Sequence, residues 1–114
     1  MEINVKTIDG VSVVKLAGDI DGSSAPAAQA AILPLAAPDC RILLDMTDVP
    51  YMSSAGLRML LSTYRQVTGK NGRVVLVGLS ENIQDTMSVT GFLKFFTVCE
   101  TVQAGLDALQ RPNG

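Results

Sequence analysis

The most informative absence in this chain of 114 residues is histidine, of which it contains none. Histidine is the commonest general base and a leading metal ligand, and it accepts the proton in Ser-His-Asp and Cys-His catalytic arrangements. The glycine patterns GxxxxGK[ST] and GxGxxG, which bind phosphates, do not occur either. The 11 acidic residues form no pair with an enzyme-like spacing. We therefore predict that the protein is not an enzyme and has no catalytic residue, cofactor or metal ion.

Cysteine is scarce, and long apolar runs are missing. The two cysteines, Cys40 and Cys99, lie far apart within apolar stretches and form no CxxC pair, which predicts buried thiols in a reducing cytosol. No apolar run approaches the ~18 residues of a membrane span. Residues 1–5 alternate as in a strand and do not resemble a signal peptide. The sequence thus predicts a cytoplasmic protein with no membrane partner.

An excess of charge of one sign is also missing. Charged residues make up 18% of the chain, the net charge is −2, and the two signs are scattered. Nucleic-acid binding needs a clustered basic surface, so we expect no nucleic-acid partner. Hydrophobic residues make up 47%, which is typical of a folded domain. We predict one domain over residues 1–110 and a flexible tail over residues 111–114.

The start of the chain predicts an antiparallel pair of strands. Alternation with neighbouring residues occurs at Ile3, Val5 and Thr7 and again at Val11, Val13 and Lys15, within runs that we interpret as strands over residues 2–8 and 11–18. The second run is mostly apolar, and Asp9–Gly10 lies between the two. Asp-Gly between alternating runs is a strong signal for a β-hairpin.

The rest of the chain predicts helices that alternate with strands. Ser23 or Ser24 can cap a first helix, which accepts Pro26 in its first turn. Pro34 should kink or end this helix near Leu33. The later helices begin at Ser53, at Ser80 or Asn82, and at Thr101, and they alternate with strands at residues 41–46, 73–77 and 95–99. The predicted fold is α/β, a mixed β-sheet with helices packed on it in the order β-β-α-β-α-β-α-β-α.

The segment of residues 45–57 is the strongest candidate for a functional site. A buried strand leads through a loop to a helix start that carries Ser53 and Ser54. The simplest interpretation makes Ser53 the N-cap and Ser54 the first helical residue. Gly56 follows in the first turn, although glycine costs ~1 kcal/mol relative to alanine in a helix. We interpret Gly56 as a place where a partner approaches closely, and we expect Gly56→Ala to leave the melting temperature unchanged or slightly raised.

Residues 45–57, DMTDVPYMSSAGL, resemble the signature of the anti-sigma factor antagonists of the STAS family, in which a strand reading D-L-S runs through F-M-D-S-[ST]-G-L. Residues 16–21 resemble the family's L-x-G-[ED]-[LI]-D turn, residues 72–77 its G-[GR]-x-[LV] strand, and residues 90–92 its [ST]-G-L segment. These matches follow the same order and extend over nearly the whole chain. The resemblance implies a STAS-like mixed β-sheet.

The resemblance also implies which residues act. In the family, the serine after M-D is phosphorylated by a partner that is both an anti-sigma factor and a serine kinase, and by position that serine is Ser54. This chain has Ser53 where the family has Asp, and Ala55 where the family has Ser or Thr. Ser53 is therefore the second candidate for phosphorylation. Asp21 matches a turn residue that supports partner binding, and it can equally well bond its own backbone. The implied partner surface is Asp21, Met52, Ser53, Ser54, Ala55 and Gly56.

The implied function is partner switching. The unphosphorylated protein binds the anti-sigma factor/serine kinase and frees a sigma factor. Phosphorylation at Ser54 ends that binding, and a serine phosphatase of the metal-dependent type restores it. The alternative is a scaffolding STAS domain in a stressosome-like or other signalling assembly without a sigma factor. A small enzyme or lipid carrier is the third possibility, which the residue inventory disfavours.

Overall fold

The chain begins with the hairpin that Asp9–Gly10 predicts. In the computed structural model, which describes residues 1–111, both residues of this turn have a positive φ, 50° at Asp9 and 79° at Gly10. A two-residue turn of this kind matches the twist of the strands that it joins. It connects β1 (Glu2–Ile8) to β2 (Val11–Ala17), and the two strands run antiparallel.

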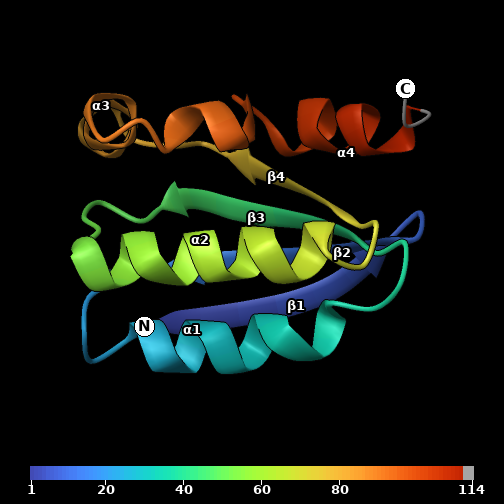
Figure 1. Ribbon diagram of the computed structural model, residues 1–114, viewed down its shortest axis with the longest axis horizontal. Helices are drawn as coiled ribbons and strands as arrows, with labels where there is room; N and C mark the ends of the chain where they lie inside the picture. Colours follow the sequence, from blue (N-terminus) through green and yellow to red (C-terminus); the bar gives the residue numbers. More distant parts are fainter. Residues whose placement is uncertain (112–114) are drawn as a thin grey trace.

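Three further strands extend the hairpin into one mixed sheet (Figure 1). They are β3 (Arg41–Asp48), β4 (Arg73–Val77) and β5 (Thr97–Cys99). The order is β1-β2-β3-β4-β5, and every pair after the first is parallel. The helices are α1 (Ala25–Ile32), α2 (Ser54–Thr68), α3 (Glu81–Val89) and α4 (Val102–Gln110). The predicted α/β class and the predicted order of elements are confirmed.

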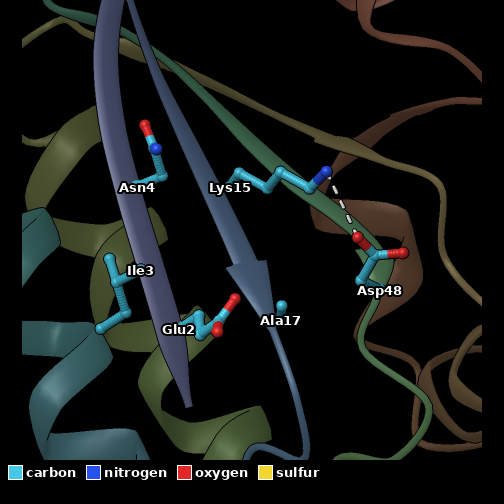
Figure 2. Close-up of a pocket in the computed structure, with 6 residues that line it drawn as sticks. All are labelled: Glu2, Ile3, Asn4, Lys15, Ala17 and Asp48. Atoms are coloured by element: carbon cyan, nitrogen blue, oxygen red, sulfur yellow. Dashed lines mark ion pairs between the residues drawn. The ribbon is translucent and has the colours of Figure 1, made fainter.

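The helices divide between the two faces of the sheet. α1, α2 and α3 cover one face, where Leu16, Leu44 and Leu76 are fully buried. α4 packs on the other face against β3, β4 and β5. Beside β1, this second face carries an open hollow of about 450 Å³, in which Lys15 forms an ion pair of 3.3 Å with Asp48 (Figure 2).

Three strands differ from their predicted bounds, and the first of them, β2, ends at Ala17, one residue before its predicted end. β3 extends to Asp48, two residues further than predicted, because it continues to pair with β2 past an irregularity in register, with Ala17 opposite Asp48. β5 begins at Thr97, two residues later than predicted, because Leu93–Phe95 forms a short 3-10 helix. This turn directs Phe96 into the core.

The helix signals are mostly confirmed. α1 ends at Ile32, and Leu33–Leu35 continues as a 3-10 turn, because Pro34 cannot donate the next helical hydrogen bond. Of the two caps proposed for α3, Ser80 is the one used, and its hydroxyl accepts a bond of 3.2 Å from a first-turn amide. Thr101 caps α4 in the same way at 3.1 Å.

The two cysteines are less buried than predicted. Cys40 and Cys99 are free thiols, and both are partly exposed. Cys40 lies just before β3 and Cys99 ends the edge strand β5, so each occupies a border of the core. Burial nevertheless raises the pKa of the Cys40 thiol.

Two other predictions concern membrane spans and the tail. No helix within residues 1–111 is long and apolar enough to cross a membrane. The predicted flexible tail over residues 111–114 lies, apart from Arg111, outside the described residues.

Candidate functional site

Two loops, at the carboxyl ends of β2 and β3, are joined side by side. Ile20 and Met52 form an isolated parallel bridge. The Ile20 amide donates to the Tyr51 carbonyl at 3.0 Å, and the Ser53 amide donates to the Ile20 carbonyl at 2.8 Å. Ile20 and Met52 are both buried, so the loops meet over the core. Asp21 and Ser53, the next residue of each loop, are therefore neighbours in this register.

The two serines form the start of α2 as predicted. Ser53 has an extended backbone (φ −82°, ψ 178°), and its hydroxyl accepts a bond of 3.2 Å from the Ala55 amide. The hydroxyl of Ser53 is thus committed to capping the helix. Ser54 is the first helical residue and is exposed. Its hydroxyl takes part in none of the hydrogen bonds formed among residues 1–111.

Asp21 forms the turn before α1. Its Oδ1 accepts bonds from the Ser23 hydroxyl at 2.7 Å, the Ser23 amide at 3.0 Å and the Ser24 amide at 3.1 Å. These bonds, that of the Ser23 hydroxyl first, lower the pKa of Asp21 below its ordinary value of 3.8. Ser24, one of the two predicted caps of α1, occupies the N-cap position, but its hydroxyl accepts no bond from a first-turn amide and donates to the Asp19 carbonyl at 2.7 Å. The turn interpretation of Asp21 is confirmed, and the turn holds an ionised carboxylate beside Ser53.

Gly56 is packed from inside the protein, which corrects the expectation that a partner approaches there. Gly56 is buried, and a Cβ built on it would overlap the Met52 side chain and lie 3.0 Å from the Ile20 carbonyl oxygen. The missing side chain allows α2 to start directly against the joined loops. Met52 is only 8% exposed, so it also supports the site from below. The members of the predicted partner surface that reach the solvent are Asp21, Ser53, Ser54 and Ala55.

Two hollows flank the start of α2. One, of about 310 Å³, lies between α1 and α2, which run side by side in Figure 1. The other, of about 340 Å³, lies between the loop of residues 50–52 and α3. Arg58 lines the first and Tyr51, 55% exposed, lines the second, and our sequence analysis missed both residues. Arg58 stands four residues after Ser54, a spacing that places both on one side of a helix and could have revealed it. The exposure of Tyr51 depends on tertiary packing.

The site offers an exposed hydroxyl and no histidine that could activate it. The chain has no histidine, and within the described residues no group of three or more cysteine, aspartate or glutamate side chains is placed to hold a metal ion. The start of a helix favours an anion through its unpaired amides and its dipole. The first turn of α2 holds no acidic residue that would repel one. The arrangement can therefore carry a phosphate on Ser54 and present it to another protein.

The chain is similar to proteins of one family. The family model described as STAS domain matches residues 2–105. The anti-sigma-B factor antagonist of Bacillus subtilis is 28% identical over 106 residues, which cover 93% of this chain and 97% of the relative. A crystal structure of an anti-sigma factor antagonist from Mycobacterium paratuberculosis is 29% identical with a TM-score of 0.86, over 96% of this chain and 94% of that one. The Bacillus protein SpoIIAA in its phosphorylated form shares the fold, with 16% identity and a TM-score of 0.73, over 96% of this chain and 100% of that one.

Proposed function

The chain belongs to the STAS domain family, and from this premise we propose that it is an anti-sigma factor antagonist switched by phosphorylation of Ser54. The observation that carries the proposal is the exposed hydroxyl of Ser54, at the first residue of α2. A kinase needs an accessible hydroxyl. Modification of Ser53 would break the bond that caps the helix, whereas modification of Ser54 would not. We therefore assign the phosphate to Ser54 and the cap to Ser53.

The proposed partner of the unphosphorylated protein is an anti-sigma factor that is also a serine kinase. Its contact surface is Asp21, Ser53, Ser54 and Ala55, supported from below by Met52 and Gly56. Hollows lie on both sides of α2, and side chains of a protein partner can fill them. The role is binding and not catalysis. A metal-dependent serine phosphatase removes the phosphate, and the whole cycle takes place in the cytoplasm, where sigma factors act.

A phosphate on Ser54 changes the free energy of folding and the free energy of partner binding by different amounts. A phosphate adds about −1.5 to −2 charges. At the start of a helix an anion is stabilised by ~0.3–1 kcal/mol, so the domain remains folded. An unpaired charge at the centre of an interface costs ~2–5 kcal/mol. Because the second term is larger and opposite, phosphorylation ends binding and leaves the fold intact. The phosphorylated form of SpoIIAA supports this, since a protein with this fold accepts a phosphate.

The test is phosphorylation by the anti-sigma kinase with ATP, followed by mass spectrometry of the peptide that holds both serines. We expect phosphate on Ser54 in the natural chain and in Ser53→Ala, and none in Ser54→Ala. Phosphate on Ser53 alone would reassign the site. A chain that binds signalling proteins but is never phosphorylated would instead support the scaffolding function.

A further inference from the structure

We propose that this protein forms a homodimer in which β1 pairs antiparallel with β1 of a second copy, in a register centred on Asn4. β1 is an edge strand of the sheet (Figure 1), and among the described residues it pairs with β2 alone. Its outer edge thus offers amides and carbonyls for pairing, and such edges bind other strands unless something blocks them. The proposal does not depend on the phosphorylation of Ser54.

The hairpin turn determines which backbone groups of β1 point outward. In a hairpin with a two-residue turn, the flanking residues Ile8 and Val11 exchange hydrogen bonds, and hydrogen-bonded pairs recur at every second residue. The residues of β1 that bond to β2 are therefore Glu2, Asn4, Lys6 and Ile8. The residues that direct their amides and carbonyls away from the sheet are Ile3, Val5 and Thr7.

This pattern makes β1 complementary to itself. When two copies pair about Asn4, Ile3 of each copy lies opposite Val5 of the other, and their outward groups form the hydrogen bonds. Glu2 of each copy then lies opposite Lys6 of the other. That position is a non-hydrogen-bonded pair, in which opposing side chains lie closest together. The two-fold symmetry produces this pair of opposite charges twice.

Within residues 1–111 of one copy, Glu2 and Lys6 form no ion pair. The single ion pair in that part of the chain joins Lys15 on β2 to Asp48 at the end of β3. Figure 2 shows that Lys15 reaches toward Asp48, while Glu2 lies beside them on β1. Glu2 and Lys6 are both exposed. A second copy of β1 would supply each with the opposite charge.

The proposed contact is apolar on the face of the sheet that α1 covers. Val5 is 45% exposed, although it lies on the face of the sheet that α1 covers, opposite the buried Val14. The exposed residues of α1, which lies next to β1, are Pro26, Ala27 and Ala30. Residues 22–38 contain no charged side chain. The core of a protein interface is depleted of charge, and small side chains let two α1 helices approach across the two-fold axis.

Charged residues on an edge strand also serve as protection against pairing, and that role predicts a monomer. The spacing of the charges favours the dimer. A register centred on Val5 would place Glu2 opposite Ile8 and Lys6 opposite Asn4, so neither charge would meet its opposite. Only the register centred on Asn4 combines the outward hydrogen-bonding groups with paired charges.

Sedimentation velocity over a concentration series tests the proposal, with any tag at the carboxyl end. We expect the natural chain to dimerise and Glu2→Lys and Lys6→Glu each to weaken the dimer about tenfold or more, because each places like charges opposite one another twice. The double variant Glu2→Lys/Lys6→Glu should restore the dimer. Glu100→Lys, an exposed charge change outside β1, is the matched control and should leave it unchanged.

A cross-linking experiment tests the register. Asn4→Cys should form a disulfide between two copies under mild oxidation, because directly opposed residues lie within disulfide reach. Thr7→Cys should not, because the two Thr7 positions would lie about 20 Å apart. The natural chain, with Cys40 and Cys99, gives the background. Val5→Pro removes only an outward amide and should give a folded monomer by circular dichroism. A natural chain that stays monomeric, single reversals with unchanged affinity, or efficient cross-linking through Thr7→Cys would overturn the proposal.

Discussion

The Ser53 amide donates a hydrogen bond of 2.8 Å to the Ile20 carbonyl, and this bond joins the turn of Asp21 to the start of α2. It holds Ser53 in the extended conformation that an N-cap requires. Ser54 then becomes the first helical residue, with its side chain in the solvent. Because Asp21 follows Ile20 directly, the same bond keeps the turn of Asp21 beside Ser53, the residue that precedes the proposed phosphate acceptor.

Gly56→Ala should lower the free energy of unfolding by ~1–3 kcal/mol. The new methyl group would overlap Met52 and press on the Ile20 backbone, which itself is held by the Ser53 amide. The better helix propensity of alanine, ~1 kcal/mol, offsets part of this cost. Urea denaturation followed by circular dichroism measures the change.

Gly22→Ala is the matched control for this substitution. Nothing lies within 4 Å of a Cβ built on Gly22, and its φ is not positive. We expect a change of less than ~0.5 kcal/mol. If Gly56→Ala is as harmless as Gly22→Ala, the packing around Gly56 is not tight, and the glycine serves a partner as the sequence first suggested.

Ser53→Ala should cost ~1 kcal/mol of stability, because the Ala55 amide loses its cap. Ser53→Asp should recover this loss, since a carboxylate both caps the helix and complements its dipole. Both variants should still be phosphorylated at Ser54. Denaturation measures the first effect and phosphopeptide mapping the second.

Thr101→Ala provides the reference for the loss of a cap, because Thr101 makes the same kind of bond at the start of α4, away from the site. The two alanine variants should lose similar amounts of stability. A Ser53→Ala chain as stable as the natural one would show that the cap contributes nothing. Loss of phosphorylation in Ser53→Ala would make Ser53 the acceptor.

The features that sequence predicts well are those that depend on near neighbours. Asp9–Gly10, Ser53 and Thr101 act on backbone groups within a few residues, so their turn and caps can be read from local patterns. The order of elements follows from the same signals. The resemblance to the STAS family added the interpretation of Ser54 as a phosphate acceptor, a role that no local pattern indicates.

The features that sequence analysis missed depend on contacts between distant segments. β3 is longer than predicted because β2 continues to pair with it as far as Asp48. Gly56 was misinterpreted because its close neighbour Ile20 belongs to another loop. The apolar spacing in α4 resembles that in α2, so it does not indicate that Leu106 and Leu109 pack on the opposite face of the sheet.

Asp21→Asn should make the stability of the protein less dependent on pH in the acid range. Hydrogen bonds, chiefly from the Ser23 hydroxyl, lower the pKa of Asp21 below 3.8 in the folded protein. The folded state therefore favours the ionised carboxyl. Its stabilising effect is complete above the unfolded pKa and is lost as the pH falls through the folded pKa. Asparagine keeps an acceptor oxygen without the charge.

The measurement is urea denaturation of both proteins at a series of pH values. The difference in unfolding free energy between the natural chain and Asp21→Asn should be constant near neutral pH and shrink below about pH 3.8. A difference that is the same at all pH values would show that the charge of Asp21 does not stabilise the turn.

Charge at residue 54 should control partner binding while the fold stays the same. Ser54→Ala should bind the anti-sigma kinase and should not be released by ATP. Ser54→Asp should fold, because a carboxylate in the first helical turn is favourable by ~0.3–1 kcal/mol. It should nevertheless bind the kinase at least about tenfold more weakly, since an unpaired charge in the interface costs ~2–5 kcal/mol. Aspartate is shorter than phosphoserine and carries less charge, so its effect falls at the lower end of this range.

Calorimetry of the natural chain, Ser54→Ala and Ser54→Asp with the same kinase measures the three affinities, and circular dichroism confirms that all three are folded. Ala104→Asp is the matched control, because Ala104 is exposed in the first turn of α4 on the other face of the sheet. It adds the same charge to the same part of a helix and should bind like the natural chain. If Ser54→Asp binds as tightly as Ala104→Asp, the charge at residue 54 does not decide the partner. Phosphorylation of Ser54 would then not explain a change of partner, and the exposed surface around α2 would instead serve the scaffolding function.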